Sequence, residues 1–272
     1  MGYILFGHNF KKVYDENMSV AFISDLHLEP IENKKTFAFF DFLESAQEKY
    51  TALYILGDFF EYWVGDDDDE LVNLEIKRQL KTATKNNLKI FFLHGNRDFL
   101  IGQKFEEDTG VQILKDKTLI QKNDHRILIA HGDAFCTDDI EYQNLKKELR
   151  SKAWKKKFLQ KPLKERIKYA QDLRAESIEK SSNKPENIMD SNPDAISNAI
   201  IAHKADILVH GHTHRPEVSQ AVNGSTKVVL GSWEDEGWVF EYDQTHFELK
   251  SFLIWKSNVI YCIYIQYFYD SS

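Results

Sequence analysis

Five apolar segments of this chain each end in a short polar cluster. With their polar ends, they cover residues 20–27, 52–58, 89–98, 126–133 and 205–214. Continuous apolar runs of this length are typical of strands that are buried on both faces. Residues 35–50 and 71–85 instead carry apolar side chains at helical spacing. Strands that alternate with helices predict an α/β fold in which helices cover both faces of a sheet.

The second half of the chain departs from this alternation between residues 139 and 189. Strand signals stop there, and the segment reads as amphipathic helices rich in Lys and Arg. We interpret it as a helical lid insertion that stands on the core. Residues 226–233 and 237–243 then read as late strands. We therefore predict a single domain over residues 18–250 with a lid insertion at about 139–189, and extensions at 1–17 and 251–272 with no assigned role.

Composition limits the classes of function. The chain has 272 residues, a net charge of −8 and 42% hydrophobic residues, which fits an ordinary globular protein and does not suggest a nucleic-acid binder. Its two cysteines are far apart, which argues against a disulfide framework or a zinc-thiolate site and fits a reducing compartment. We expect neither a signal peptide nor a membrane-spanning segment, so that any membrane contact would be peripheral.

The polar clusters are rich in metal-binding side chains. They are Asp25-x-His27, Gly57-Asp58, Gly95-Asn96-Arg97-Asp98, His131-Gly132-Asp133 and Gly211-His212-Thr213-His214. Sites in α/β sheets form where the carboxyl ends of strands meet, so we expect these clusters to converge. Nitrogen and oxygen ligands without a thiolate suit Mn²⁺, Fe²⁺ or Zn²⁺, and the large oxygen share favours Mn²⁺. The ligands are too many for one ion and favour two ions about 3.5–4 Å apart.

Each feature also has a simpler interpretation. A single Asp-x-His is usually a turn with a satisfied histidine, but five clusters together favour a metal site. We predict that Asp98 and Asp133 orient ligands and do not bind metal. The acidic run at residues 65–70 is predicted to be a solvated loop before a helix. The basic stretch of the lid is either a solvated helix face or an amphipathic surface for anionic lipid headgroups.

The order of the motifs resembles that of a known family. Asp-x-His, GD, GNRD, HGD and GHTH, over about residues 20–233, resemble the calcineurin-like metallophosphoesterases. The resemblance implies a sandwich of two mixed β-sheets flanked by helices. It also implies seven metal-ligating and catalytic side chains, with Asp58 bridging two ions. One ion would be held by Asp25, His27, Asp58 and His214, and the other by Asp58, Asn96, His131 and His212.

Longer motifs narrow the resemblance within that family. "SDLHL", "LYILGDFFEYWVGDDD", "FFLHGNRDFLIG" and "HGHTHRP" resemble the UDP-2,3-diacylglucosamine diphosphatases of lipid A biosynthesis. The resemblance implies two Mn²⁺ ions per subunit and water attack at the α-phosphorus of UDP-2,3-diacylglucosamine. The products would be UMP and 2,3-diacylglucosamine 1-phosphate (lipid X). The expected location is peripheral, at the cytoplasmic face of the cell inner membrane.

The same resemblance implies a set of substrate contacts. They are Asn96, Arg97, Asp139, Ser177, Ser181, Lys184 and His212. Ser181 departs from the pattern, because better-known members carry Asn there, and a substrate hydrogen bond could be altered. The expected partners are the lipid substrate and an anionic membrane surface, met through the basic lid. We expect no nucleic acid and infer no obligate protein partner.

Two other functions stay open at the level of sequence. One is another two-metal phosphodiesterase or nucleotide pyrophosphatase of the same family. The other is a metal-free scaffold on the same fold. A scaffold predicts missing ligands, whereas all seven expected ligands are present.

Overall fold

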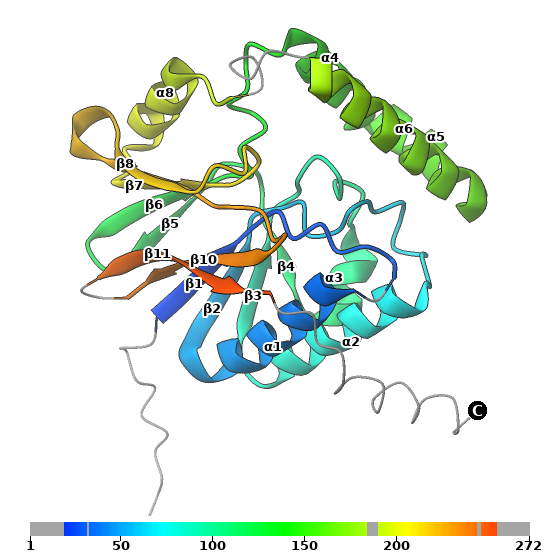
Figure 1. The fold of residues 1–272 in the computed structure, drawn as a ribbon, viewed down its shortest axis with the longest axis horizontal. Helices are drawn as coiled ribbons and strands as arrows, with labels where there is room; N and C mark the ends of the chain where they lie inside the picture. Colours follow the sequence, from blue (N-terminus) through cyan, green and yellow to red (C-terminus); the bar gives the residue numbers. More distant parts are fainter. Residues whose placement is uncertain (1–18, 32, 184–189, 244–245, 255–272) are drawn as a thin grey trace, which may run out of the picture.

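The protein is described by a computed structural model that covers residues 19–31, 33–183, 190–243 and 246–254. Its strands form two sheets, and helices lie on the outer sides of the sheets (Figure 1). The α/β sandwich that the family resemblance implies is therefore confirmed. Strand periodicity alone had predicted one covered sheet, because a buried strand reads the same whether a helix or a second sheet covers it.

The first sheet has six strands in the order β11-β10-β1-β2-β3-β4. Strands β1 to β4 run parallel, whereas β10 pairs antiparallel with both β1 and β11. The strand bounds are β1 Ser19–Ile23, β2 Tyr50–Ile55, β3 Lys89–Phe92, β4 Gln112–Ile113, β10 Glu236–Tyr242 and β11 Phe247–Leu253.

The second sheet has five strands in the order β5-β6-β7-β9-β8. Its three central strands are parallel, and the two edge strands are antiparallel to their neighbours. The bounds are β5 Thr118–Lys122, β6 His125–Ile129, β7 Ile207–His210, β8 Glu217–Gln220 and β9 Thr226–Val229, with a 3₁₀ turn, η1, at Val222–Gly224.

Alternate side chains of each strand face opposite layers. In β1, Val20 and Phe22 pack against the second sheet, whereas Ala21 and Ile23 face helices. The helices on that side are α1 Lys34–Lys49, α2 Leu71–Lys85 and α3 Gln103–Thr109. The outer face of the second sheet packs against α8 Pro193–His203. The strands are therefore buried on both faces, which explains their continuous apolar character.

The described part of the insertion contains three helices: α4 Ile140–Leu149, α5 Lys152–Leu159 and α6 Leu163–Asn183. They form an arm beside the sandwich, drawn in green at the upper right of Figure 1. Leu149 and Phe158 are buried in the same apolar cluster as the helices of the first sheet. Trp154 stacks on Phe158, with ring centroids 4.5 Å apart. The arm is thus packed on the core through apolar contacts.

The acidic run at residues 65–70 is a loop before α2, as predicted, but only part of it is solvated. Asp68 is buried, and Asp66 accepts hydrogen bonds from the backbone N–H groups of Gly102 and Phe105, at the start of α3. Asp67 pairs with Arg166 of α6. The prediction is wrong for Asp66 and Asp68, whose carboxylates are held by protein donors, whereas Asp69 and Glu70 are exposed as expected.

Several elements are absent from the sequence prediction. Strands β4, β5, β8 and β11 and helices α3 and α8 were not expected. Residues 1–17, 184–189 and most of 251–272 lie outside the described residues, so the domain and lid boundaries stay predictions. In the described part of the chain, none of the helices combines the length and apolar character needed to cross a bilayer.

Arg166 offers a test of how the arm is held. Its side chain is 3% exposed and donates to the Val64 carbonyl at 2.6 Å. Arg166→Met would leave that carbonyl and Asp67 without this donor. We expect the free energy of unfolding in urea to fall by about 1–3 kcal/mol. Lys164→Met, on the exposed face of the same helix, should stay within about 0.5 kcal/mol of wild type. Equal loss in both variants would contradict the assignment.

Candidate metal centre and substrate cavity

The seven expected metal ligands all follow strands and converge at one edge of the sandwich. They come from the loops after β1 (Asp25, His27), β2 (Asp58), β3 (Asn96), β6 (His131) and β7 (His212, His214). Two groups of three have ligand atoms within 4.8 Å of one another: Asp25, His27 and His214, and Asp58, His131 and His212.

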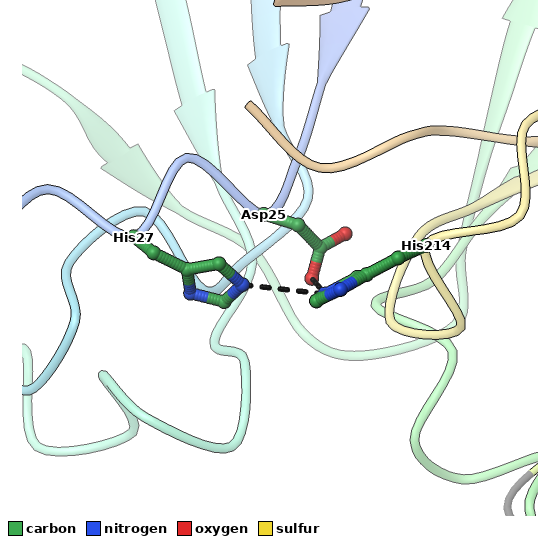
Figure 2. Close-up of side chains that lie close together, drawn as sticks. All are labelled: Asp25, His27 and His214. Atoms are coloured by element: carbon green, nitrogen blue, oxygen red, sulfur yellow. Dashed lines mark hydrogen bonds and ion pairs between the residues drawn. The ribbon is translucent and has the colours of Figure 1, made fainter. Parts of the chain in front are cut away.

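The first group lies between the loops that follow β1 and β7. Figure 2 shows the side chains of Asp25, His27 and His214 pointing toward a common point. The Nε2 atoms of the two imidazoles are 3.2 Å apart, and His214 Nε2 lies 3.3 Å from Asp25 Oδ1. The other carboxylate oxygen, Oδ2, accepts hydrogen bonds from the Ser24 hydroxyl and the His212 backbone N–H. One oxygen is thus anchored, and the other faces the imidazoles.

The second group is built around His131. Its Nδ1 lies 2.9 Å from the Leu56 carbonyl, a contact that fixes the imidazole and directs Nε2 toward the group. That Nε2 lies 2.9 Å from Asn96 Oδ1 and 3.7 Å from Asp58 Oδ1. The rings of His131 and His212 are 5.1 Å apart. Asn96 therefore joins this group, as the family resemblance implies.

Two hydrogen bonds connect the groups. The His212 backbone N–H, from the second group, donates to Asp25 Oδ2 of the first at 2.9 Å. The His27 backbone N–H donates to the Asp58 carbonyl at 3.1 Å. These two contacts hold the loops of one group against the loops of the other, so the two groups form one centre.

The backbone of the centre adopts an unusual conformation. Five of the seven residues have positive φ angles: Asp25 (58°), His27 (50°), Asp58 (49°), His212 (71°) and His214 (56°). Side-chain-bearing residues seldom occupy this left-handed region, and each such residue costs about 1–3 kcal/mol. Such strain is concentrated at functional sites, where surrounding contacts hold a side chain in a direction that relaxed backbone would not give.

Two glycines make room for the carboxylates. A Cβ on Gly95 would lie 2.1 Å from Asp58 Oδ1, and a Cβ on Gly211 would lie 2.2 Å from Asp25 Oδ2. Real Cβ atoms do not come that close, so any other residue would displace the carboxylate.

Burial and neighbouring charges shift several pKa values. Burial, with the charge of Arg97, lowers the pKa of His27, and burial beside His131 lowers that of His212 to about 4. Burial would raise the pKa of Asp25, but the hydrogen bond and charge of His214 outweigh it and lower the pKa. Neutral imidazole and ionised carboxylate are the forms that bind metal ions.

Divalent ions fit the converging ligand atoms of the centre. The buried Asp25 Oδ1 lies 3.3 Å from His214 Nε2, and His27 Nε2 lies 3.2 Å from the same nitrogen, so that three ligand atoms face one point. Burial would lower the pKa of His131, yet the carboxylates of Asp58 and Asp133 raise it, so they favour positive charge here. Mixed imidazole, carboxylate and amide donors suit transition-metal ions.

Comparison with known proteins agrees with this geometry. The sequence profile of the calcineurin-like phosphoesterases matches residues 18–216 of the chain.

The chain belongs to that family.

The resemblance noted in the sequence is thus confirmed, and membership implies divalent metal ions at the centre.

Curated relatives of this phosphoesterase are similar over almost their whole length. A UDP-2,3-diacylglucosamine hydrolase of Serratia proteamaculans is 41% identical over 238 residues, which cover 86% of this chain and 99% of the relative. One from Yersinia pseudotuberculosis is 38% identical with the same coverage. A solved structure of an archaeal phosphodiesterase is 14% identical, with a TM-score of 0.46. The match covers 87% of this chain and 99% of that protein's chain. Family membership rests on the sequence matches.

A cavity of about 830 Å³ opens beside the second group of the phosphoesterase. Five of the expected substrate contacts line it: Asn96, Arg97, Asp139, Ser177 and His212. Lys184 and the side chain of Ser181 lie outside the described residues, so the structure does not place these two contacts.

Sequence reasoning missed several residues of this cavity, among them Tyr142 and Arg174. The ring centroids of Tyr142 and His212 lie 6.2 Å apart in a stacked arrangement. The Arg174 Nε lies 2.5 Å from Glu61 Oε1. Tyr142, Lys146 and Arg150 are four residues apart, so they lie on one face of α4 and its C-terminal end, and this spacing could have indicated Tyr142. Arg174 is one of many basic residues in the insertion, and no sequence pattern distinguishes it from the others.

Asp133 holds that face of α4 against the centre. Its Oδ2 accepts hydrogen bonds from the Tyr142 hydroxyl at 2.8 Å, Lys146 at 2.9 Å and Arg150 at 3.1 Å. Arg150 also donates to the Gly95 carbonyl at 2.8 Å. These contacts fit an orienting role, because they join the arm to the loops that carry the expected ligands.

Asp98 connects two of these loops. Its carboxylate accepts hydrogen bonds from the backbone N–H groups of Phe59 and Gly95, each at 2.8 Å. Burial and the nearby charge of Asp58 raise its pKa to about 7. The loop after β2 is thereby joined to the loop after β3, which fits the orienting role predicted for this residue.

Gly95→Ala tests the fit of the carboxylate. The added methyl group would meet Asp58 Oδ1, so we expect the purified, dialysed protein to retain at most half of its divalent metal by elemental analysis. Gly224→Ala is the control: its φ is +75°, but its Cβ would meet nothing within 4 Å. That variant should lose about 1 kcal/mol of stability and keep its metal. Full metal retention in Gly95→Ala would contradict the proposed ligand geometry.

Proposed function

We propose that this phosphoesterase hydrolyses the pyrophosphate bond of UDP-2,3-diacylglucosamine in lipid A biosynthesis. The observation that carries the proposal is the 41% identity to a hydrolase of that name over 99% of its length. Water attacks the α-phosphorus and the bridging oxygen leaves with the β-phosphate. The products are UMP and 2,3-diacylglucosamine 1-phosphate, so that atoms balance with one water consumed.

We further propose two Mn²⁺ ions per subunit. Asp25, His27 and His214 would hold one, and Asn96, His131 and His212 the other, with Asp58 shared. When bound, such ions lower the pKa of water and stabilise charge on the phosphoryl group. The mixed nitrogen and oxygen donor set without a thiolate is compatible with manganese, and the two groups of converging ligand atoms support the number of ions.

The side chains around the centre would hold the pyrophosphate. The Arg97 Nε lies 3.3 Å from Asp58 Oδ2, and its guanidinium also pairs with Glu61. These contacts fix the direction of a planar group that suits phosphate oxygens. Arg174 shares the Glu61 partner and lines the same cavity. We propose that both arginines, with Asn96, orient the phosphates for in-line attack.

The arm supplies walls suited to acyl chains. An apolar compartment of about 140 Å³ is lined by Phe99, Leu149, Trp154 and Phe158 among others. Its wall shares Asn96, Arg97, Arg174 and Ser177 with the 830 Å³ cavity. We propose that the diacylglucosamine lies in the 830 Å³ cavity, with its acyl chains directed toward this apolar compartment, and contacts Asp139, Ser177, Ser181, Lys184 and His212.

We also propose that the enzyme binds peripherally at the cytoplasmic face of the inner membrane. Four basic side chains of the arm turn inward and pair with core groups: Lys146, Arg150, Arg166 and Arg174. Others are exposed: Lys147, Lys152, Lys156, Lys157, Lys161, Lys164 and Lys168. Exposed lysines beside an exposed Leu159 suit anionic headgroups.

Release of UMP tests the proposed reaction. We expect Mn²⁺-dependent UMP release from UDP-2,3-diacylglucosamine, abolished by chelator and reduced at least 100-fold in Asp58→Ala, because that variant loses the shared ligand. Wild-type release with metal and with chelator is measured side by side. Turnover that is equal in wild type and Asp58→Ala would reject the two-metal site.

A soluble substrate separates this proposal from its nearest alternative. A UDP-sugar without acyl chains gains nothing from the apolar compartment, so its kcat/KM should be at least 100-fold lower. Equal turnover of both substrates would favour a general nucleotide pyrophosphatase of the family.

Vesicle sedimentation tests the membrane surface. Lys156→Glu with Lys157→Glu should weaken binding to phosphatidylglycerol vesicles at least tenfold, because each lysine near such a surface contributes about 1 kcal/mol. Lys81→Glu with Lys85→Glu makes the same charge change on exposed positions of α2 and should have little effect. Equal binding to neutral phosphatidylcholine vesicles would contradict an electrostatic contact.

A further inference from the structure

A second cavity, of about 650 Å³, opens beside the first group of the metal centre. His27 and His214 of the first group reach into it, and Glu29, Lys35 and Glu234 form part of its wall. Its volume falls within the range of about 300–1,000 Å³ that is typical of small-molecule sites. Nothing in the proposed binding of the diacylglucosamine uses this space.

The two cavities differ in character but share part of their walls. Arg97, Arg174 and His214 line both the 650 Å³ and the 830 Å³ cavities. A pyrophosphate at these shared residues would direct its two substituents into opposite cavities. Charged side chains line both cavities, but the 830 Å³ cavity also has apolar side chains of the arm, such as Leu145 and Ile178, whereas the described arm residues that line the 650 Å³ cavity are polar. Acyl chains fit the former and a nucleotide fits the latter.

Lys35 is the distinctive cation of the second cavity. It lies in the first turn of α1 and is 8% exposed. Its Nζ is 3.6 Å from Glu234 Oε1 and 3.9 Å from Glu29 Oε1, beyond good hydrogen-bond distance. Within the described residues, this ammonium group makes ion pairs but no hydrogen bond. Holding a cation with little water and weak partners is costly unless a ligand completes its surroundings.

We propose that this cavity binds the UMP half of the substrate, with Lys35 contacting the nucleotide phosphate and Glu29 or Glu234 accepting the ribose hydroxyls. The inference rests on the proposed function and assigns the opposite half of the same substrate. Carboxylates bind ribose hydroxyls in other nucleotide sites, and a lysine binds phosphate as a point charge. The Tyr62 side chain, also in the wall, offers a ring against which a base can pack.

Calorimetric titration of UMP into the Mn²⁺-loaded enzyme tests the assignment. Lys35→Met should weaken UMP binding about tenfold or more, the usual effect of losing a charged hydrogen bond. Lys35→Arg keeps the positive charge and should restore part of the affinity. Binding of the other product, 2,3-diacylglucosamine 1-phosphate, should change less than twofold in both variants.

Lys34→Met is the matched control. Lys34 is the preceding residue of α1, but its ammonium pairs with Asp235 at 2.5 Å and does not line the cavity. UMP affinity should therefore be unchanged. Thermal melting of all three variants shows whether any loss of binding reflects unfolding.

The outcomes separate this inference from the proposed function. Unchanged UMP affinity in folded Lys35→Met overturns the cavity assignment, even where the lipid substrate is hydrolysed. Equal weakening of both products in Lys35→Met also overturns it, because the effect is then not specific to the nucleotide half. Lys35-dependent UMP binding without hydrolysis of UDP-2,3-diacylglucosamine supports the cavity and rejects the proposed function.

Discussion

The pairing of β1 with β2 continues past the ends of both strands, and the metal centre depends on that continuation. Beyond the strands, the N–H of Leu56 donates to the Ile23 carbonyl at 2.8 Å, and the Asp25 N–H donates to Gly57 at 3.1 Å. The His27 N–H then reaches the Asp58 carbonyl. A parallel ladder fixes register residue by residue, so Asp25, His27 and Asp58 are positioned by the same hydrogen bonds that build the sheet.

Buried carboxylates around the centre are each compensated in a different way. Asp98 accepts two backbone N–H groups, whereas Asp133 faces a hydroxyl and two cations of α4. A buried charge without partners is costly, and removing one partner of such a network leaves the other unpaired. Each buried carboxylate needs its partners from the loops and the arm. The positions of the loops and the arm therefore depend on one another.

Much of the candidate site could be predicted from sequence, because the parallel strands that end in ligand side chains bring their carboxyl ends to the same end of the sandwich. The family resemblance then grouped those ligands. The left-handed backbone at Asp25 and Asp58 was not predictable, because neither residue type requires it. The acidic loop was misjudged in part because the backbone donors to Asp66 lie far along the chain, at Gly102 and Phe105. A local sequence pattern shows which residues a segment contains, but it does not show which distant residues form hydrogen bonds or ion pairs with them.

The order of the ligands along the chain has a consequence for biosynthesis. The first group joins Asp25 and His27 to His214, which lies 187 residues after His27. Domains fold as units during synthesis from the N-terminus, so this group is complete only after nearly the whole domain has left the ribosome. A metal ion that binds the folded centre stabilises only the finished domain. We therefore expect metal loading only after the chain has been synthesised past His214.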